Sequence, residues 1–141
     1  DDTPDTEVVR SGELLVRREQ PDYLLIHPMG CDFVGHNFGG ESDEYRRQAE
    51  RIDALLAEFV PSWLEHGYHV MVTADHGMDT KGSHGGTRDE VTTVPFYWLS
   101  ADNPGCGVRR ELAEQTAIAP TVLSVLGLKP TAAMQQDALR W

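Results

Sequence analysis

Two short stretches of the sequence carry acidic and histidine side chains at spacings that suit a metal site. The stretch VMVTADHGMDTKGSHGG, residues 70–86, begins as an apolar run and then presents Asp75, His76 and His84 among glycines. The stretch CDFVGHNFGG, residues 31–40, presents Asp32 and His36. Carboxylate oxygen and imidazole nitrogen suit zinc, and also manganese or iron. A single Asp-His pair is equally typical of a polar turn, so the elements around these stretches must indicate whether the residues form a metal site.

The runs YLLIH, residues 23–27, and YHVMVTA, residues 68–74, are continuously apolar, which is typical of strands covered on both faces. Between them, Ser42 caps a predicted helix with an apolar stripe that includes Phe59 and Trp63. Strand, helix and strand form a βαβ unit, so strands near 23–27 and 69–73 should be parallel and adjacent. Both glycine-rich loops then leave the same carboxyl edge, where α/β proteins bind ligands.

The other elements complete an α/β fold. We expect a short amphipathic helix over residues 5–20, a third strand near 94–99 with Pro95 at an end or edge, and a last helix from Pro120 to about Gly127. Pro61 should kink or split the long helix, and Gly67 suits its end. The segment 28–40 is expected to be a loop because glycines interrupt it.

The candidate ligands are more numerous than one tetrahedral ion needs when a position must stay open for substrate. Asp32, His36, Asp75, His76 and His84 therefore indicate a pair of ions. Two ions about 4 Å apart can hold the attacking and leaving oxygens of an in-line phosphoryl displacement. The pattern thus favours an enzyme acting on a small phosphate ester.

Composition narrows the class of protein. The chain has 141 residues, enough for one domain with a real core, and its net charge of −11 disfavours binding to a nucleic-acid backbone. No apolar run is long enough to span a bilayer. The two cysteines, Cys31 and Cys106, form no disulfide framework and suggest a reducing compartment. We expect a soluble protein, with the cytoplasm favoured.

Residues 31–40 and 70–86 together resemble the metal-binding half of the alkaline phosphatase superfamily. The D-x-x-x-H, DHGM and G-x-H-G-G motifs stand in order, and the closest branch is the type I phosphodiesterase/nucleotide pyrophosphatase group, with its relatives the GPI ethanolamine phosphate transferases. The similarity spans roughly residues 21–130. It implies a three-layer α/β fold, with helices flanking a mainly parallel sheet.

By this resemblance, Asp32, His36 and His84 would bind one zinc, and Asp75 and His76 the second, with manganese possible in place of zinc. The family takes a further aspartate ligand and a Thr or Ser nucleophile from an N-terminal half that residues 1–20 do not resemble. We therefore expect residues 1–141 to be the C-terminal portion of one catalytic domain, inactive alone, from a metal-dependent phosphodiesterase or pyrophosphatase.

Several alternatives share these motifs. A phosphomonoesterase, phosphonate hydrolase, phosphomutase or phosphoethanolamine transferase stays open, and so does a metal-stabilised domain without catalysis. A sulfatase is disfavoured because no C-x-P-x-R motif is present. An isolated partial sheet would expose an apolar edge, so self-association of the chain is a further expectation.

Overall fold

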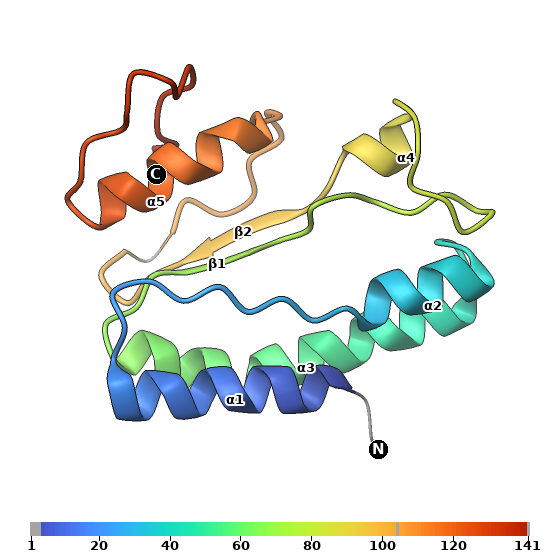
Figure 1. Ribbon diagram of the computed structural model, residues 1–141, viewed down its shortest axis with the longest axis horizontal. Helices are drawn as coiled ribbons and strands as arrows, with labels where there is room; N and C mark the ends of the chain where they lie inside the picture. Colours follow the sequence, from blue (N-terminus) through green and yellow to red (C-terminus); the bar gives the residue numbers. More distant parts are fainter. Residues whose placement is uncertain (1–3, 104, 141) are drawn as a thin grey trace. The chain divides into compact units, whose positions relative to one another are not determined.

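The computed structural model describes residues 4–103 and 105–140, which fall into two compact units divided between Ala101 and Asp102. Unit 1 ends with Ala101 and unit 2 begins with Asp102. In unit 1 the chain forms α1 (Pro4–Glu19), α2 (Gly30–Phe38), α3 (Asp43–Glu65), β1 (Val70–Thr73), α4 (Asp89–Thr92) and β2 (Phe96–Leu99) (Figure 1). In unit 2 it forms the short 3₁₀ helix η1 (Gln115–Ala117) and α5 (Ile118–Val125).

The expected helices at both ends of the chain are present. Helix α1 fills the predicted range, and α5 holds Pro120 near its start. Gly127, just beyond α5, has φ +70° and donates its N–H to Ser124 O at 3.1 Å, which ends the helix. The side chain of Thr121 is fully buried and donates to Ala117 O at 2.6 Å.

Helix α3 starts and ends where the sequence indicates. Ser42 Oγ accepts a hydrogen bond from Tyr45 N at 3.1 Å, and Gly67 beyond the end has φ +83°. Of the two expectations for Pro61, a kink or a split, the split is wrong, because α3 continues as one helix to Glu65. Proline removes one backbone N–H donor and with it one hydrogen bond of the helix. Only about one helical turn follows Pro61, so few interactions depend on that hydrogen bond.

The core of unit 1 lies between α1, α3 and β1. Its buried members are Val9, Val16, Trp63 and Val70. Glu13 of α1, 7% exposed, accepts hydrogen bonds from Trp63 Nε1 at 2.6 Å and from Ser62 Oγ at 3.2 Å. Burial alone would raise the pKa of Glu13, but hydrogen bonds from Arg17, Trp63 and Ser62 outweigh it and lower that pKa. The anionic carboxylate thus ties α1 to α3.

The sheet differs from the expected one. In the described residues it has two strands, and β1 pairs antiparallel with β2, from Val70 opposite Leu99 to Thr73 opposite Phe96. The prediction of a strand at 23–27 paired parallel with β1 is therefore wrong for the described residues, and these residues do not show a mainly parallel three-layer sheet. The observed architecture is a mixed arrangement of helices and a small sheet.

Residues 23–27 are extended but pair with no strand among the described residues. Leu24 and Ile26 pack against the core, whereas Leu25 is 72% exposed and Tyr23 is 56% exposed. Within this chain, only one face of the apolar run therefore packs against the core. In Figure 1 the segment nevertheless runs in the same direction as β1, and both lead toward α2 and the loop after β1.

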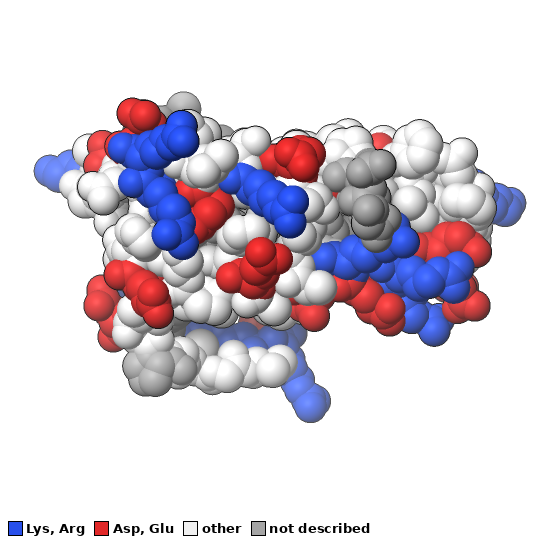
Figure 2. Space-filling model, turned by 90° about the horizontal axis from the view of Figure 1, so that it is seen from below, with Lys and Arg blue, Asp and Glu red and all other residues white. Residues whose placement is uncertain are grey.

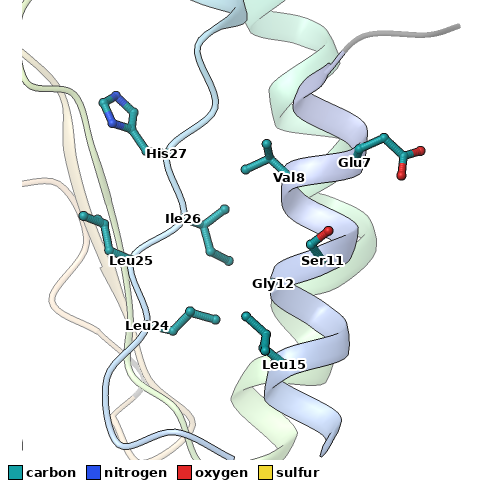
Figure 3. A pocket seen from close by; sticks show the side chains of 9 residues that line it. All are labelled: Glu7, Val8, Ser11, Gly12, Leu15, Leu24, Leu25, Ile26 and His27. Carbon is teal, nitrogen blue, oxygen red and sulfur yellow. The ribbon is translucent and has the colours of Figure 1, made fainter. Parts of the chain in front are cut away.

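A shallow groove of about 300 Å³ separates this extended segment from α1. Figure 3 shows Val8 and Leu15 of α1 facing Leu24 and Ile26 across it, while Leu25 points away. The groove is apolar and lies away from the Asp and His residues singled out above.

The segment expected to be a glycine-rich loop is helix α2 instead. Gly35 lies inside this helix at a position with no room for a side chain. A Cβ there would approach Met78 Cε to 2.7 Å and Tyr45 Cε2 to 3.1 Å. The glycine thus allows α2 to pack closely on the loop after β1 and on α3. The close packing of α2 on its neighbours favours a helix over the expected loop, and the pattern of glycines in the sequence does not reveal that packing.

Charged side chains of both signs alternate on the face of unit 1 that α1 and α3 cover (Figure 2). Arg47 Nη2 lies 2.8 Å from Glu44 Oε1, and Arg46 Nη2 lies 3.5 Å from Asp43 Oδ1. That face therefore carries no patch of a single sign. Within residues 4–103 and 105–140, no helix has the length and apolarity of a membrane span.

Candidate metal centre

Helix α2 and the loop after β1 supply all the residues singled out from the sequence. Asp32 lies in the first turn of α2 and His36 in its last turn, four residues apart and hence on one face. Asp75, His76 and His84 lie beyond the end of β1, in a segment without helix or strand. The structure brings these two segments together at one end of unit 1 (Figure 1).

One oxygen atom is at the centre of the cluster. Asp32 Oδ1 lies 3.5 Å from His36 Nε2, 3.7 Å from His76 Nε2 and 3.9 Å from His84 Nε2. It is a buried side-chain oxygen without a hydrogen-bond partner, the single such atom found in the described part of the chain. An anionic oxygen in that state requires a cation or a donor nearby.

Backbone carbonyls orient two of the imidazoles. His36 Nδ1 lies 2.8 Å from Gly82 O, and His76 Nδ1 lies 2.9 Å from Gly77 O. Because a carbonyl oxygen only accepts, each Nδ1 must carry the hydrogen and donate it. The lone pair of each neutral ring is then on Nε2, which faces Asp32, as in histidines that ligate metals.

His84 completes the cluster from the far end of the loop. Its ring stacks on that of His76, with centroids 3.8 Å apart and an angle of 18°, and lies 5.0 Å from the ring of His36. His84 thus folds back across the loop to meet His76 and His36. Asp32, His76 and His84 each offer one ligand atom within 4.8 Å of the others.

Asp75 is placed at the margin. Its Oδ2 lies 3.8 Å from His76 Nε2, its Oδ1 accepts from His76 N at 3.1 Å, and its side chain is 66% exposed. The resemblance pairs Asp75 with His76 on one ion and His84 with His36 on another. The distances instead place His76 and His84 together beside Asp32. The assignment of each ligand to an ion stays a prediction.

The donor set fits a divalent metal. One carboxylate oxygen and three imidazole nitrogens have the chemistry of a zinc site, and manganese or iron would also accept them. The unpartnered oxygen of Asp32 supplies the observation that the sequence could not: one carboxylate oxygen is already buried, without a hydrogen-bond partner, among three imidazole nitrogens.

Two residues that support the cluster were not anticipated from the sequence. Asp5 accepts hydrogen bonds from Met29 N and Gly30 N at the start of α2, and Asp79 accepts from Lys81 N and Ser83 N in the loop before His84. For Asp79 the order Asp-x-x-Gly was a usable turn signal. For Asp5 no local signal existed, because its partners lie more than twenty residues away.

Comparison with known proteins agrees with the cluster. A model of the family described as type I phosphodiesterase / nucleotide pyrophosphatase matches residues 2–113, most of the chain. The chain belongs to this family. The resemblance inferred from the D-x-x-x-H, DHGM and G-x-H-G-G motifs is confirmed.

Relatives of this type I phosphodiesterase family member include transferases and mutases. GPI ethanolamine phosphate transferase 3 of Schizosaccharomyces pombe is 32% identical over 112 residues, covering 75% of this chain and 12% of the relative. The 2,3-bisphosphoglycerate-independent phosphoglycerate mutase of Halobacterium salinarum is 33% identical over 117 residues, covering 80% of this chain and 23% of the mutase. The chain thus spans less than a quarter of either relative. No solved structure gives a significant match.

The family and the cluster together support a coarse conclusion. The chain is a phosphoesterase-like domain segment of the alkaline phosphatase superfamily, whose members depend on metals. The relatives of the chain named above are enzymes.

Proposed function

We propose that the whole protein is a metal-dependent hydrolase of phosphodiester or pyrophosphate bonds in a small phosphate-ester substrate. The proposal rests mainly on one observation: three imidazole Nε2 atoms surround a buried oxygen of Asp32 that has no hydrogen-bond partner. In a family of phosphoesterases, such a cluster is best explained as a set of metal ligands.

The ligands in this proposal are Asp32, His36, Asp75, His76 and His84, and they hold two divalent ions, with zinc favoured over manganese. When bound, such ions polarise the phosphoryl group and stabilise its attacking and leaving oxygens. The distances support Asp32 as the central ligand. The family pattern would place His36 and His84 with Asp32, and Asp75 with His76.

The residues of this chain act as a preset frame in this proposal. Gly82 O and Gly77 O hold the rings of His36 and His76 with Nε2 facing Asp32, so no rearrangement of these rings is needed on binding. Asp75, with its exposed side chain, borders the solvent side where substrate would enter. We place the nucleophile outside these 141 residues, so that the chain alone is inactive.

The same view explains the exposed apolar residues of segment 23–27. We propose that in the whole protein this segment joins a three-layer, mainly parallel sheet, in which an added strand pairs with its backbone and a flanking layer covers Leu25. Separated from such a strand, the chain should self-associate through this edge. Light scattering tests the idea: a monomer at high concentration that binds no apolar dye would contradict it.

Transfer to an acceptor other than water is the second candidate. It is favoured by the activities of two relatives, a GPI ethanolamine phosphate transferase and a phosphoglycerate mutase, rather than by the geometry. Both candidates use the same ligands and differ in the molecule that receives the phosphoryl-containing group.

An assay of the whole protein distinguishes these possibilities. Purified protein is stripped with a chelator, reloaded with zinc or manganese, and given bis(p-nitrophenyl) phosphate, a dinucleotide pyrophosphate, and p-nitrophenyl phosphate. We expect the diesters to be cleaved with metal and not without it. His84→Ala should abolish cleavage, and Asp53→Ala, which removes an exposed carboxylate of α3, should not. Cleavage only when an alcohol or ethanolamine acceptor is added would favour transfer, and cleavage in the chelated enzyme would refute the proposal.

A further inference from the structure

The loop over residues 79–83 controls two of the proposed ligands at once. Its last residue precedes His84 directly, and its Gly82 carbonyl receives the hydrogen bond from His36 Nδ1 at 2.8 Å. A change in the shape of this loop would therefore move His84 and release the ring of His36 together.

Asp79 fastens the loop through its side chain. That side chain is 4% exposed, and its Oδ1 accepts hydrogen bonds from Lys81 N and Ser83 N, both at 2.8 Å. Its Oδ2 forms an ion pair with Arg88 Nη2. A single carboxylate thus satisfies two backbone donors of the loop and is itself balanced by a guanidinium from beyond His84.

The backbone of Asp79 closes the same loop and joins it to α2. Asp79 N donates to Ser83 O at 2.9 Å, while Asp79 O accepts from Gly82 N at 3.2 Å and from Gly40 N at 2.8 Å. Gly40 follows α2, the helix that carries Asp32 and His36. The two segments of the metal centre are therefore held to each other through this residue.

The loop has little freedom to rearrange. Gly82 has φ +77°, and a Cβ there would lie 2.8 Å from Gly35 O and 2.7 Å from His36 O. A left-handed residue in direct contact with the backbone of α2 can hardly be displaced without also disturbing the helix. The loop and α2 consequently share one packed arrangement.

We propose that Asp79, paired with Arg88, is a positioning residue that presets the 79–83 loop, so that His84 and the Gly82 carbonyl stand in place before an ion binds. The inference rests on the proposed function, in which His36 and His84 are metal ligands. Asp79 does not itself touch the cluster. It acts on affinity by avoiding the loss of loop entropy that binding to an unformed loop would require.

The test compares zinc affinities of variants of the metal-stripped whole protein by calorimetry, with circular dichroism as the check of folding. Changes of residues that orient metal ligands typically weaken metal affinity 10–100-fold. We expect a weakening of about that size for Asp79→Ala and a smaller one for Asp79→Asn, whose carbonyl oxygen can still accept from Lys81 N and Ser83 N. Asp53→Asn is the charge-matched control and should bind like the wild type.

The outcomes separate the inference from the proposed function. If His84→Ala binds zinc as tightly as the wild type, the proposed function fails. If His84→Ala weakens binding but folded Asp79→Ala binds like Asp53→Asn, the proposed function stands and the positioning role of Asp79 is refuted.

Two further measurements keep the test decisive if Asp79→Ala does not fold. Arg88→Gln retains the Asp79 carboxylate and should weaken zinc affinity, with wild-type affinity counting against the role of the pair. In the metal-free wild type, the amides of Lys81 and Ser83 should exchange with solvent far more slowly than unprotected amides. Exchange at the unprotected rate would mean that the loop is not preset, and would overturn the inference.

Discussion

The start of α2 depends on one carboxylate from α1, and removing it tests how the metal centre is supported. Asp5 is 2% exposed, and its Oδ1 accepts hydrogen bonds from Met29 N and Gly30 N, each at 3.0 Å. Its Oδ2 accepts from Gln48 Nε2 of α3 at 2.7 Å. Asp5→Ala therefore leaves two backbone donors and one side-chain amide without this acceptor.

The size of the effect follows from those groups. Loss of a side-chain acceptor at a helix start costs about 0.5–2 kcal/mol, and a buried donor left unpaired costs about 1–3 kcal/mol. We expect Asp5→Ala to lower the free energy of unfolding by about 2–5 kcal/mol. Asp5→Asn keeps an oxygen for Met29 N and Gly30 N, and Gln48 can turn its amide to accept, so about 1 kcal/mol should be lost.

Urea unfolding of the whole protein measures these differences, with Asp53→Ala as the exposed control. A double-mutant cycle with Gln48→Ala should give a coupling energy of at least about 0.5 kcal/mol, because the two side chains are in direct contact. Asp5→Ala should also weaken zinc affinity, since α2 carries Asp32 and His36. An Asp5→Ala protein no less stable than the control would refute the reasoning.

Other changes give separate tests. In the whole protein with metal in excess, Asp32→Ala or Asp75→Ala should remove nearly all phosphodiester hydrolysis, measured as initial rates, because each loses an anionic ligand; retained turnover would mean that the site is misassigned. Gly35→Leu should reduce both thermal stability and zinc affinity, since its side chain would collide with Met78. The pKa of Glu13 is lowered from its ordinary 4.5 by folding, so its stabilising contribution is complete above about pH 4.5 and is lost as the pH falls through the lower folded value. Glu13→Gln should flatten that part of the stability profile in urea titrations, and an unchanged acid slope would argue against an anionic Glu13.

Local sequence signals were sufficient to predict those helices and strands whose secondary structure depends mainly on their own residues. The Ser42 cap and the stripe ending at Trp63 predicted α3, and the apolar runs predicted β1 and β2 near their observed positions. Caps, periodic apolar faces and turn glycines act over a few residues, so they can be recognised without any knowledge of the fold.

The candidate site was predictable for a different reason. Asp32, His36, Asp75, His76 and His84 are unusual in type and spacing, so chemistry alone selected them. The structure then brings them to one place, although residues 23–27 and β1 do not form the parallel strand pair whose shared edge was expected to do so. Convergence comes instead from α2 packing on the loop after β1, through Gly35 and Gly82.

The sequence by itself determined which residues can do chemistry, the family, and the helices and strands with strong local signals. Only the tertiary structure decided that residues 30–38 form a helix, that β1 pairs antiparallel with β2, that Asp5 supports the start of α2, and that Asp79 joins its loop to the end of α2. These features depend on groups that are distant along the chain: Asp5 meets Gly30, and Gly40 meets Asp79. Such contacts leave no periodic trace in the sequence, because each is decided by packing between elements rather than by the preference of any one segment.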